Sequence, residues 1–482
     1  MNIREVLHIV GALLVWAAGA MLPAVPFAVQ DGLLRPWLGA IGLTAAVGAL
    51  LWAMTPRIVS INPREGIAIV GLGWVAIVLA GCLPFVFTGV APTLAAAVFE
   101  STSGFTTTGG TVYPVIETLP QSILLWRSVT HWIGGMGIIV LGVAILPVLG
   151  VGGAQLFRAE MPGIVTDRLT PRIATTARLL WGVYALLTTV LALVYLALGM
   201  TPFEAANHAM SALATGGFST RTASLGAFSP AIQWVTAVFM FVAGVNFTLH
   251  YQMLTGRWRA WFRDPEWRWY CASTVGVMAA VFVALSLRAG AWSADGFREA
   301  AFNVAAVHST TGFATADFAA WPAVAQVLLL GLMFVGAMGG STGGGFKVVR
   351  AAVVAQHTRG ELRKVLHPRA VVVTRLGRTA LRPDLVLNVL AFLGIYVTTH
   401  ALGTIALAAL GSDLVTAMSA ALAAMSSVGP GLGDVGPAGH YGNLTPAAHL
   451  VLSALMLLGR LEFYTLLVLF IPGVWARAGG KR

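Results

Sequence analysis

Apolar stretches long enough to cross a lipid bilayer recur along almost the whole chain. A membrane-spanning helix needs about 20 mostly apolar residues, and ten stretches of roughly this length lie at 6–28, 37–55, 66–88, 122–148, 178–200, 229–253, 269–288, 322–350, 384–408 and 447–472. Of the 482 residues only 10% are charged, compared with about 25% in soluble domains. The sequence therefore predicts a polytopic helical membrane protein. We interpret the run Val6–Val29, which follows Arg4, as its first membrane helix rather than a signal peptide.

Four shorter apolar segments lie between alternate pairs of these stretches. They cover 92–109, 202–216, 295–312 and 413–429, and they are too short or too interrupted to cross the membrane, as is typical of re-entrant segments. Each unit is then helix, re-entrant segment, helix, and four such units can surround one axis. We predict an all-α fold of four pseudo-repeats around a central pore, preceded by two extra N-terminal helices. The predicted units are 1–58 for the extension, and 59–160, 161–258, 259–360 and 361–482 for the repeats.

Most of the positive charge lies in the loops that join one repeat to the next. These loops contain Arg57, Arg64, Arg158, Arg168, Arg172, Arg178, Arg257, Arg259, Arg263 and Arg268, and a further basic loop runs from Arg350 to Arg382. Cytoplasmic loops carry such an excess, so the short segments are predicted to enter from outside and both termini to be cytoplasmic. Topology thus accounts for the net charge of +11 without a nucleic-acid partner. The 350–382 loop is expected to contact anionic membrane lipids, a regulatory partner, or both.

The short segments end in similar sequences. We align them as Thr107-Thr108-Gly109, Ala214-Thr215-Gly216, Thr310-Thr311-Gly312 and Ser427-Val428-Gly429. Backbone carbonyls from four loops can replace the water around a cation. Glycine reaches the φ > 0 conformations that such a strand needs, and a β-branched or hydroxyl residue before it keeps the backbone stiff. The pattern therefore predicts a cation filter.

The segments that precede the filter are predicted to be short helices. Thr201, Pro202 and Glu204 have the order expected of an N-cap, a first-turn proline and a capping-box acid. Such a helix would aim its negative C-terminal dipole end at the ion.

A glycine-rich stretch interrupts the apolar segment 322–350. It consists of Gly339, Gly340, Ser341, Thr342, Gly343, Gly344 and Gly345. A helix should break here, because each glycine costs roughly 1 kcal/mol relative to alanine. A phosphate-binding loop would need lysine directly after glycine, but Phe346 precedes Lys347. We expect a flexible intramembrane loop that acts as a gate, and close helix packing is the alternative.

A few charged and histidine residues fall within or near the apolar segments. Arg460 lies inside the last one, where a charge is expensive and is expected to face a cavity. The alternative is a structural pair with Glu462, although a separation of two residues does not place them on one helix face. The acidic and histidine residues toward the outside include Glu100, Asp317, Asp434, His131, His208 and His308. The acids could concentrate cations at a pore mouth or be ordinary loop charges. The histidines could relay protons, but we expect structural polar contacts.

Three longer motifs resemble the Trk/Ktr/HKT potassium transporter superfamily, in particular its bacterial TrkH branch. They are 103–109 (SGFTTTG), 131–137 (HWIGGMG) and 340–347 (GSTGGGFK), and the short sequence 458–462 (LGRLE) agrees with them. The resemblance implies a homodimer in the bacterial inner membrane, with a separate pore in each subunit and a cytoplasmic, nucleotide-binding subunit of the TrkA type. It also implies that Arg460 lies at the pore near the gating loop. In that family glycine in all four loops accompanies potassium selectivity, whereas serine in the first loop accompanies sodium transport.

Several alternatives remain open from the sequence. Transport could be passive or coupled to protons or sodium, and a sodium-permeable cation transporter is less favoured. An enzyme is not expected, because no cluster of residues has metal-ligand spacing and no nucleophile lies beside a base. No bound organic cofactor is expected, and K⁺ would be the transported ion. A transporter with inverted repeats is disfavoured, because its repeats would have opposite topologies.

Overall fold

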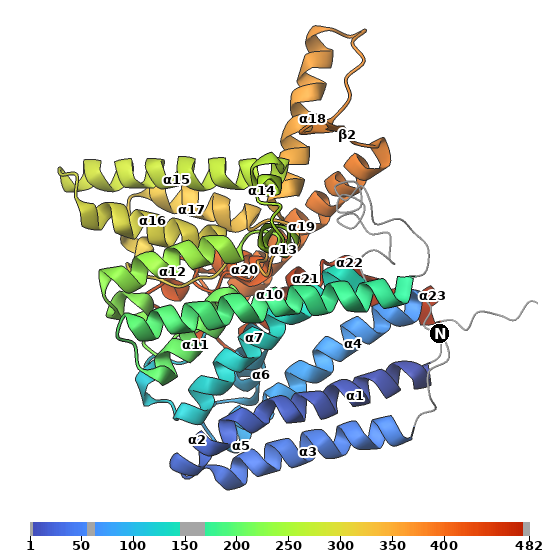
Figure 1. Ribbon diagram of the computed structural model, residues 1–482, viewed down its shortest axis with the longest axis vertical. Coiled ribbons are helices and arrows are strands. Elements are labelled where there is room, and N and C mark those ends of the chain that lie inside the picture. The colour runs from blue at the N-terminus through green and yellow to red at the C-terminus, as the bar shows by residue number, and fades with distance from the viewer. Residues whose placement is uncertain (1–2, 55–62, 145–168, 476–482) are drawn as a thin grey trace, which may run out of the picture.

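The computed structural model describes residues 3–54, 63–144 and 169–475. Two short strands, β1 (Arg375–Leu376) and β2 (Thr379–Ala380), form an antiparallel hairpin, and almost all other regular structure in these ranges is helical. The predicted all-α fold is confirmed (Figure 1). Arg57, Arg158, Arg168 and both chain ends, on which part of the predicted membrane orientation depends, lie outside the described residues.

The N-terminal extension is a pair of helices that pack closely on each other. It comprises α1 (Ile3–Met21), η1 (Leu22–Ala24), α2 (Val25–Gln30) and α3 (Leu34–Ala53). A Cβ atom added to Gly11 would lie 2.7 Å from the Gly48 carbonyl oxygen, and one added to Gly48 would lie 2.8 Å from the Gly11 carbonyl oxygen. The two helices therefore cross at a point where only glycine fits. The α1 helix also packs against α4, at the edge of the four-repeat body (Figure 1).

Four repeats follow, each with a first long helix, a short pore helix and a second helix. The first repeat contains α4 (Pro63–Gly81), α5 (Leu83–Phe87), α6 (Leu94–Phe105), η2 (Ile116–Thr118) and α7 (Gln121–Ala144). The second contains α10 (Leu169–Ala197), α11 (Pro202–Leu213), η3 (Ser224–Ala227), α12 (Pro230–Ala243), α13 (Phe247–Leu254) and α14 (Arg259–Arg263). The third contains α15 (Pro265–Ala289), α16 (Ala294–His308), η4 (Phe318–Ala320), α17 (Ala323–Val335) and α18 (Val348–Leu366). The fourth contains α19 (Pro383–Ala409), α20 (Leu414–Ser426), η5 (Gly433–Val435), η6 (Tyr441–Asn443), α21 (Pro446–Arg460), α22 (Tyr464–Leu467), η7 (Val468–Phe470) and α23 (Pro472–Trp475).

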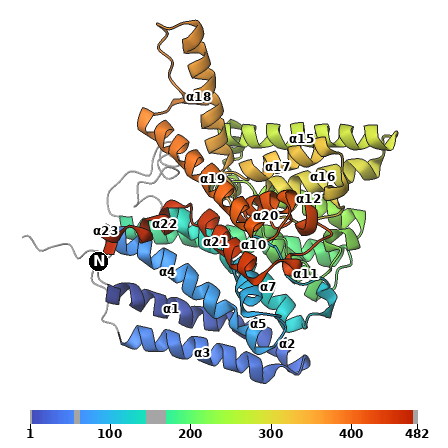
Figure 2. The same ribbon diagram turned by 180° about the vertical axis from the view of Figure 1, so that it is seen from behind.

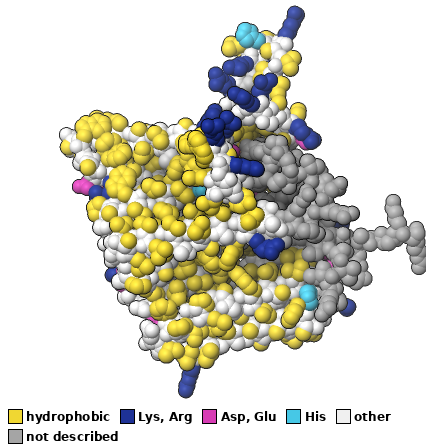
Figure 3. Space-filling view, viewed as in Figure 1, with side chains coloured by type: hydrophobic (Ala, Val, Ile, Leu, Met, Phe, Trp, Pro, Cys, Tyr) yellow, Lys and Arg dark blue, Asp and Glu magenta, His cyan; other side chains and the backbone are white. Residues whose placement is uncertain are grey.

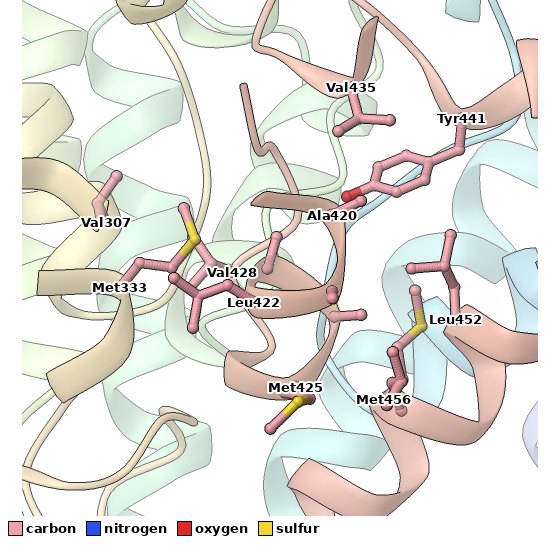
Figure 4. Close-up of a cluster of buried hydrophobic side chains, with 14 of the residues drawn as sticks. Val307, Met333, Ala420, Leu422, Met425, Val428, Val435, Tyr441, Leu452 and Met456 are labelled. Carbon is pink, nitrogen blue, oxygen red and sulfur yellow. The ribbon is translucent and has the colours of Figure 1, made fainter. Parts of the chain in front are cut away.

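The repeats close into a ring through the pore helices α6, α11, α16 and α20. The second helix of each repeat packs against the pore helix of the next: α7 against α11, α12 against α16, α17 against α20, and α21 against α6. The view from behind shows α20 beside α19 and α21, with which it is in contact (Figure 2). Figure 4 shows one such contact, with Met333 of α17 on one side of α20, and Leu452 and Met456 of α21 on the other.

Each pore helix begins at a side chain that caps it. Thr93, Thr201, Ser293 and Asp413 accept hydrogen bonds from backbone N–H groups of the first turn, at 3.1 Å, 3.3 Å, 3.0 Å and 2.9 Å respectively. Such caps satisfy donors that have no partner within the helix. The N-terminus predicted at Thr201 is thereby confirmed.

Within the described ranges, six helices are long and apolar enough to cross a membrane by length and composition, or eight if each of two bent pairs counts as one crossing. These bent pairs lie at the predicted crossings 229–253 and 447–472, and in each of them the helix is broken. The first bends by 102° after α12 and the second by 110° after α21. At the first bend Asn246 caps α13, with its Oδ1 atom 2.8 Å from the Thr248 backbone nitrogen. At the second, Glu462 and Phe463 have φ angles of 59° and 50°.

The face seen in Figure 3 is mostly apolar over the helical body, whereas α18 projects from it and carries Lys and Arg side chains. A broad apolar surface of this kind fits contact with lipid tails. The α18 helix begins immediately after the glycine-rich stretch, so it connects the interior of the molecule to the projecting tip.

Candidate ion pathway

Four glycines lie side by side at the centre of the ring of pore helices. These residues, Gly109, Gly217, Gly312 and Gly429, have φ angles of 83°, 82°, 74° and 94°. Cβ atoms added to them would lie 2.0, 2.2, 1.7 and 2.6 Å from the carbonyl oxygens of Gly216, Thr311, Val428 and Thr108, respectively. Each glycine thus contacts the carbonyl of the next segment, and the last segment contacts the first. We call these four residues the glycine ring.

A second ring of equivalent residues lies two positions earlier in each segment. Thr107, Thr215, Thr310 and Ser427 all have left-handed backbones, with φ angles of 55°, 54°, 62° and 54°. Left-handed conformations are uncommon for residues other than glycine, so their recurrence in four segments defines the structural register. We call these four residues the hydroxyl ring.

This register corrects our alignment of the second repeat by one residue. Gly217, not Gly216, occupies the position of Gly109, and Thr215 matches Thr107 rather than Thr108. Gly216 has its own constraint, because a Cβ atom there would lie 2.1 Å from His131 Nδ1. The sequence did contain the signal, since only this alignment places a hydroxyl residue at the same position in all four segments.

Side chains behind the strands hold them in place. The hydroxyls of Thr106 and Thr108 lie 2.8 Å apart, and those of Ser309 and Thr311 lie 2.7 Å apart. The Tyr441 hydroxyl donates to the Gly429 carbonyl at 2.6 Å. These contacts leave the central strands little freedom to change conformation.

Glu100 is an internal anchor rather than a charge at the pore mouth. It is fully buried, and its carboxylate lies 2.8 Å from Arg127 Nε and 3.1 Å from the Val112 backbone nitrogen. Three pore helices have a polar residue at this position, seven residues before the hydroxyl ring. In the other two, His208 Nε2 lies 2.9 Å from Ser219 Oγ, and Asn303 donates to Thr315 Oγ1 at 3.0 Å. All three fasten the chain just beyond the glycine ring.

The other two histidines that we considered also have structural contacts. His131 Nδ1 lies 3.1 Å from Ser211 Oγ, and its ring stacks on Phe218. His308 Nδ1 lies 2.7 Å from Thr274 Oγ1. These contacts fit our preference for structural roles over proton relay.

A cavity of about 640 Å³ opens on the glycine-ring side, and we call it the vestibule. Its lining includes Glu117, Arg221 and Asp317, whereas Asp434 is not part of it. Partial burial would raise the pKa of the Glu117 carboxyl, but hydrogen bonds from Thr222 and the charge of Arg221 hold this pKa below its usual value. Glu117 is therefore ionised at neutral pH, and it adds a negative charge to a vestibule that also contains Arg221 and Asp317.

The glycine-rich loop lies against the opposite end of the central strands. The α17 helix ends at Val335 and α18 begins at Val348, so the predicted break is confirmed. The Gly344 backbone N–H donates to Thr310 Oγ1 at 2.7 Å. A Cβ atom on Gly344 would lie 2.1 Å from the Ser426 carbonyl oxygen. The loop is thus in direct contact with the hydroxyl-ring end of the third and fourth segments.

Charged side chains surround this loop. Arg460 is 3% exposed and donates to the carbonyl oxygens of Thr342, at 2.7 Å, and Gly134, at 3.3 Å. Lys347 donates to the Gly343 carbonyl. Glu462 pairs with Arg350. The alternative pairing of Glu462 with Arg460 therefore does not occur, and Arg460 links the loop to α7.

The described residues therefore form a helical membrane protein in which four loops from one chain meet around a central axis. The model of the TrkH family, described as cation transport proteins, matches residues 38–475. The chain is 40% identical to the Trk system potassium uptake protein TrkH of Halomonas elongata, covering 99% of this chain and all of that protein. It is also 40% identical to TrkH of Escherichia coli K12, with coverage of 98% and 100%.

Its fold matches the crystal structure of the potassium transporter TrkH from Vibrio parahaemolyticus with a TM-score of 0.91. The two chains are 38% identical, and the match covers 99% of this chain and all of the other. The chain belongs to the TrkH family of cation transport proteins.

Proposed function

We propose that this protein takes up potassium ions across the bacterial inner membrane through the centre of its four repeats. The observation that carries the proposal is the closed contact of the four segments at the glycine ring. Carbonyls arranged around one axis can replace the hydration shell of a cation. The filter residues would be Thr107, Thr108, Gly109, Thr215, Gly216, Gly217, Thr310, Thr311, Gly312, Ser427, Val428 and Gly429, with Ala214 just before the second segment. The names of the relatives, as potassium uptake proteins, support potassium as the ion.

Potassium selectivity can be tested with purified protein in liposomes. We expect rubidium and potassium to permeate readily and sodium more weakly. All four positions of the ring are glycine, and in the family that this chain resembles, four glycines accompany potassium selectivity. Flux of ⁸⁶Rb⁺ should be inhibited by external K⁺ at lower concentrations than by Na⁺. Equal K⁺ and Na⁺ fluxes would contradict the proposal.

A second measurement separates passive from proton-coupled transport. It is the reversal potential under opposed K⁺ and H⁺ gradients, because this potential shifts with pH only if transport is coupled to protons.

The glycine-rich loop is proposed to be the gate. Gly343 and Gly344 contact the hydroxyl ring at Thr310 and Ser427, so a loop of Gly339–Gly345 with Lys347 would obstruct an ion leaving the filter. Arg460 holds this loop through the Thr342 carbonyl, and its positive charge opposes cation leak.

Replacing Arg460 with alanine should raise ion flux measured without any partner protein. The loop would lose its bond from Arg460 to the Thr342 carbonyl, and a fixed positive charge would leave the pathway. We expect an increase of about tenfold in ⁸⁶Rb⁺ uptake, the factor that corresponds to a charged hydrogen bond of about 1.5 kcal/mol. The selectivity for K⁺ over Na⁺ should be unchanged. Arg460→Lys keeps the charge and should give a smaller increase, so wild-type flux in both variants would exclude this role.

Regulation is proposed to act through α18. Its projecting position and its basic residues, including Arg359, Arg363 and Lys364, suit docking of a cytoplasmic nucleotide-binding subunit of the TrkA type, with anionic lipids as additional contacts (Figure 3). A pull on this helix would be transmitted directly to the glycine-rich loop.

We further propose a homodimer with one pore in each subunit and with both termini in the cytoplasm.

A further inference from the structure

One buried carboxylate holds both ends of the glycine-rich loop. Glu266 is the second residue of α15, and it is 2% exposed. Its Oε1 atom accepts a hydrogen bond from the Gly339 backbone N–H at 2.7 Å and another from the Val349 backbone N–H at 3.1 Å. Gly339 lies at the start of the loop, and Val349 lies in the first turn of α18. A single oxygen atom from a different helix therefore joins the two sides of the break.

The break itself creates the need for this acceptor. The first N–H groups of a helix have no partner within the helix, and Lys347, which occupies the N-cap position of α18, provides no side-chain cap. Glu266 caps α18 in its place. A negative charge is also favourable at the positive end of the helix dipole, and it offsets part of the charge of Lys347 at the same helix start.

We propose that Glu266 is a positioning residue that keeps the gate closed, and this inference rests on the gate proposed above. The Val349 bond ties α18 to α15, so displacement of α18 by a partner must break it. Because the Gly339 and Val349 N–H groups donate to the same oxygen atom, a shift of Glu266 that follows the loss of the Val349 bond also weakens the Gly339 bond. Opening the gate would thus begin with the release of one carboxylate from two backbone donors.

Backbone contacts to the second repeat hold the other side of the same segment. The Phe247 N–H donates to the Gly340 carbonyl, and the Met338 N–H donates to the Gly244 carbonyl, both at 3.0 Å. These bonds do not involve Glu266, and they remain when its side chain is changed. Removal of the carboxylate should therefore loosen the loop without releasing it completely.

The test is the ⁸⁶Rb⁺ uptake of the purified full-length protein in liposomes, without a partner protein. Glu266→Ala removes both hydrogen bonds to the carboxylate and should raise basal uptake by at least about fivefold. Glu266→Gln keeps an acceptor oxygen and should give a smaller increase. The preference for K⁺ over Na⁺ should not change, because the carboxylate contacts the loop rather than the strands of the glycine ring.

Two further variants distinguish gating from general damage. Asp264→Ala removes the cap of α15 itself, where Asp264 accepts from the Trp267 N–H at 2.8 Å, and it should leave basal uptake unchanged. In protein that lacks 339–345, Glu266→Ala should produce no additional increase, since there is no loop left to hold. Wild-type uptake in Glu266→Ala, when the loop deletion alone raises uptake, would overturn this inference. If the loop deletion fails to raise uptake, the proposed gate fails instead.

Discussion

Replacing Gly312 with alanine should abolish potassium flux while leaving the protein folded in the membrane. The added Cβ atom would lie 1.7 Å from the Val428 carbonyl oxygen and 2.9 Å from Pro430 Cδ, and Gly312 has a φ angle of 74°. Neither contact can be relieved by rotating a side chain, because one is to backbone and the other to a proline ring. The fourth segment must therefore move, and its carbonyl leaves the ring. We expect ⁸⁶Rb⁺ uptake to fall by at least about 100-fold, because a filter depends on the placement of its carbonyls.

A matched control is available within the same repeat. Gly331 lies on α17, and a Cβ atom there would meet no other atom within 4 Å, so Gly331→Ala should transport like the wild type. Both variants should elute as single peaks of equal size on gel filtration in detergent. Normal uptake with normal selectivity in Gly312→Ala would show that ions do not pass through the glycine ring.

Deleting 339–345 should have the opposite effect, a large rise in basal flux. These residues contact the hydroxyl-ring end of the central strands through Gly344 and are held there by Arg460 and Glu266. Without them the pathway beyond the strands is unobstructed. We expect uptake in liposomes to increase by about tenfold or more, the factor that corresponds to loss of at least 1.4 kcal/mol of closed-state stability.

The deletion needs a control of equal length outside the pathway. Residues 367–373 lie between α18 and the β-hairpin, and Val371 is 93% exposed, so their removal should leave basal uptake unchanged. Unchanged or abolished flux in a monodisperse protein that lacks 339–345 would argue that the loop is a packing element. The Arg460→Ala and Glu266→Ala effects should then be absent as well.

The sequence predicts the repeat structure well because its signals are local. A capping residue begins each pore helix, glycines make α17 stop, and apolar stretches of membrane length mark the long helices. Such features depend on neighbours within a few residues. The end of α17 and the start of α11 at Thr201 could therefore be located without knowledge of the fold.

Other features depend on residues that are far apart in the sequence. The bend after α12 is joined by backbone hydrogen bonds to 338–340, and the bend after α21 places Glu462 beside Arg350. Glu266 looks like an ordinary acid in a first helical turn until α18 is placed next to it. In the second repeat Gly216 and Gly217 both match a single glycine by identity. The recurring hydroxyl residue and the left-handed backbone of Thr215 select Gly217.

The closed contact among four unlike segments also has a genetic consequence. In a pore built from identical subunits, one codon change alters every strand at once. Here each of the four segments is encoded separately, as Thr108 and Val428 illustrate, which differ although each directly precedes a glycine of the ring. A single mutation changes only one of the four residues of the ring. In the proposed filter, ion preference could therefore change in small steps, and the four segments could evolve independently.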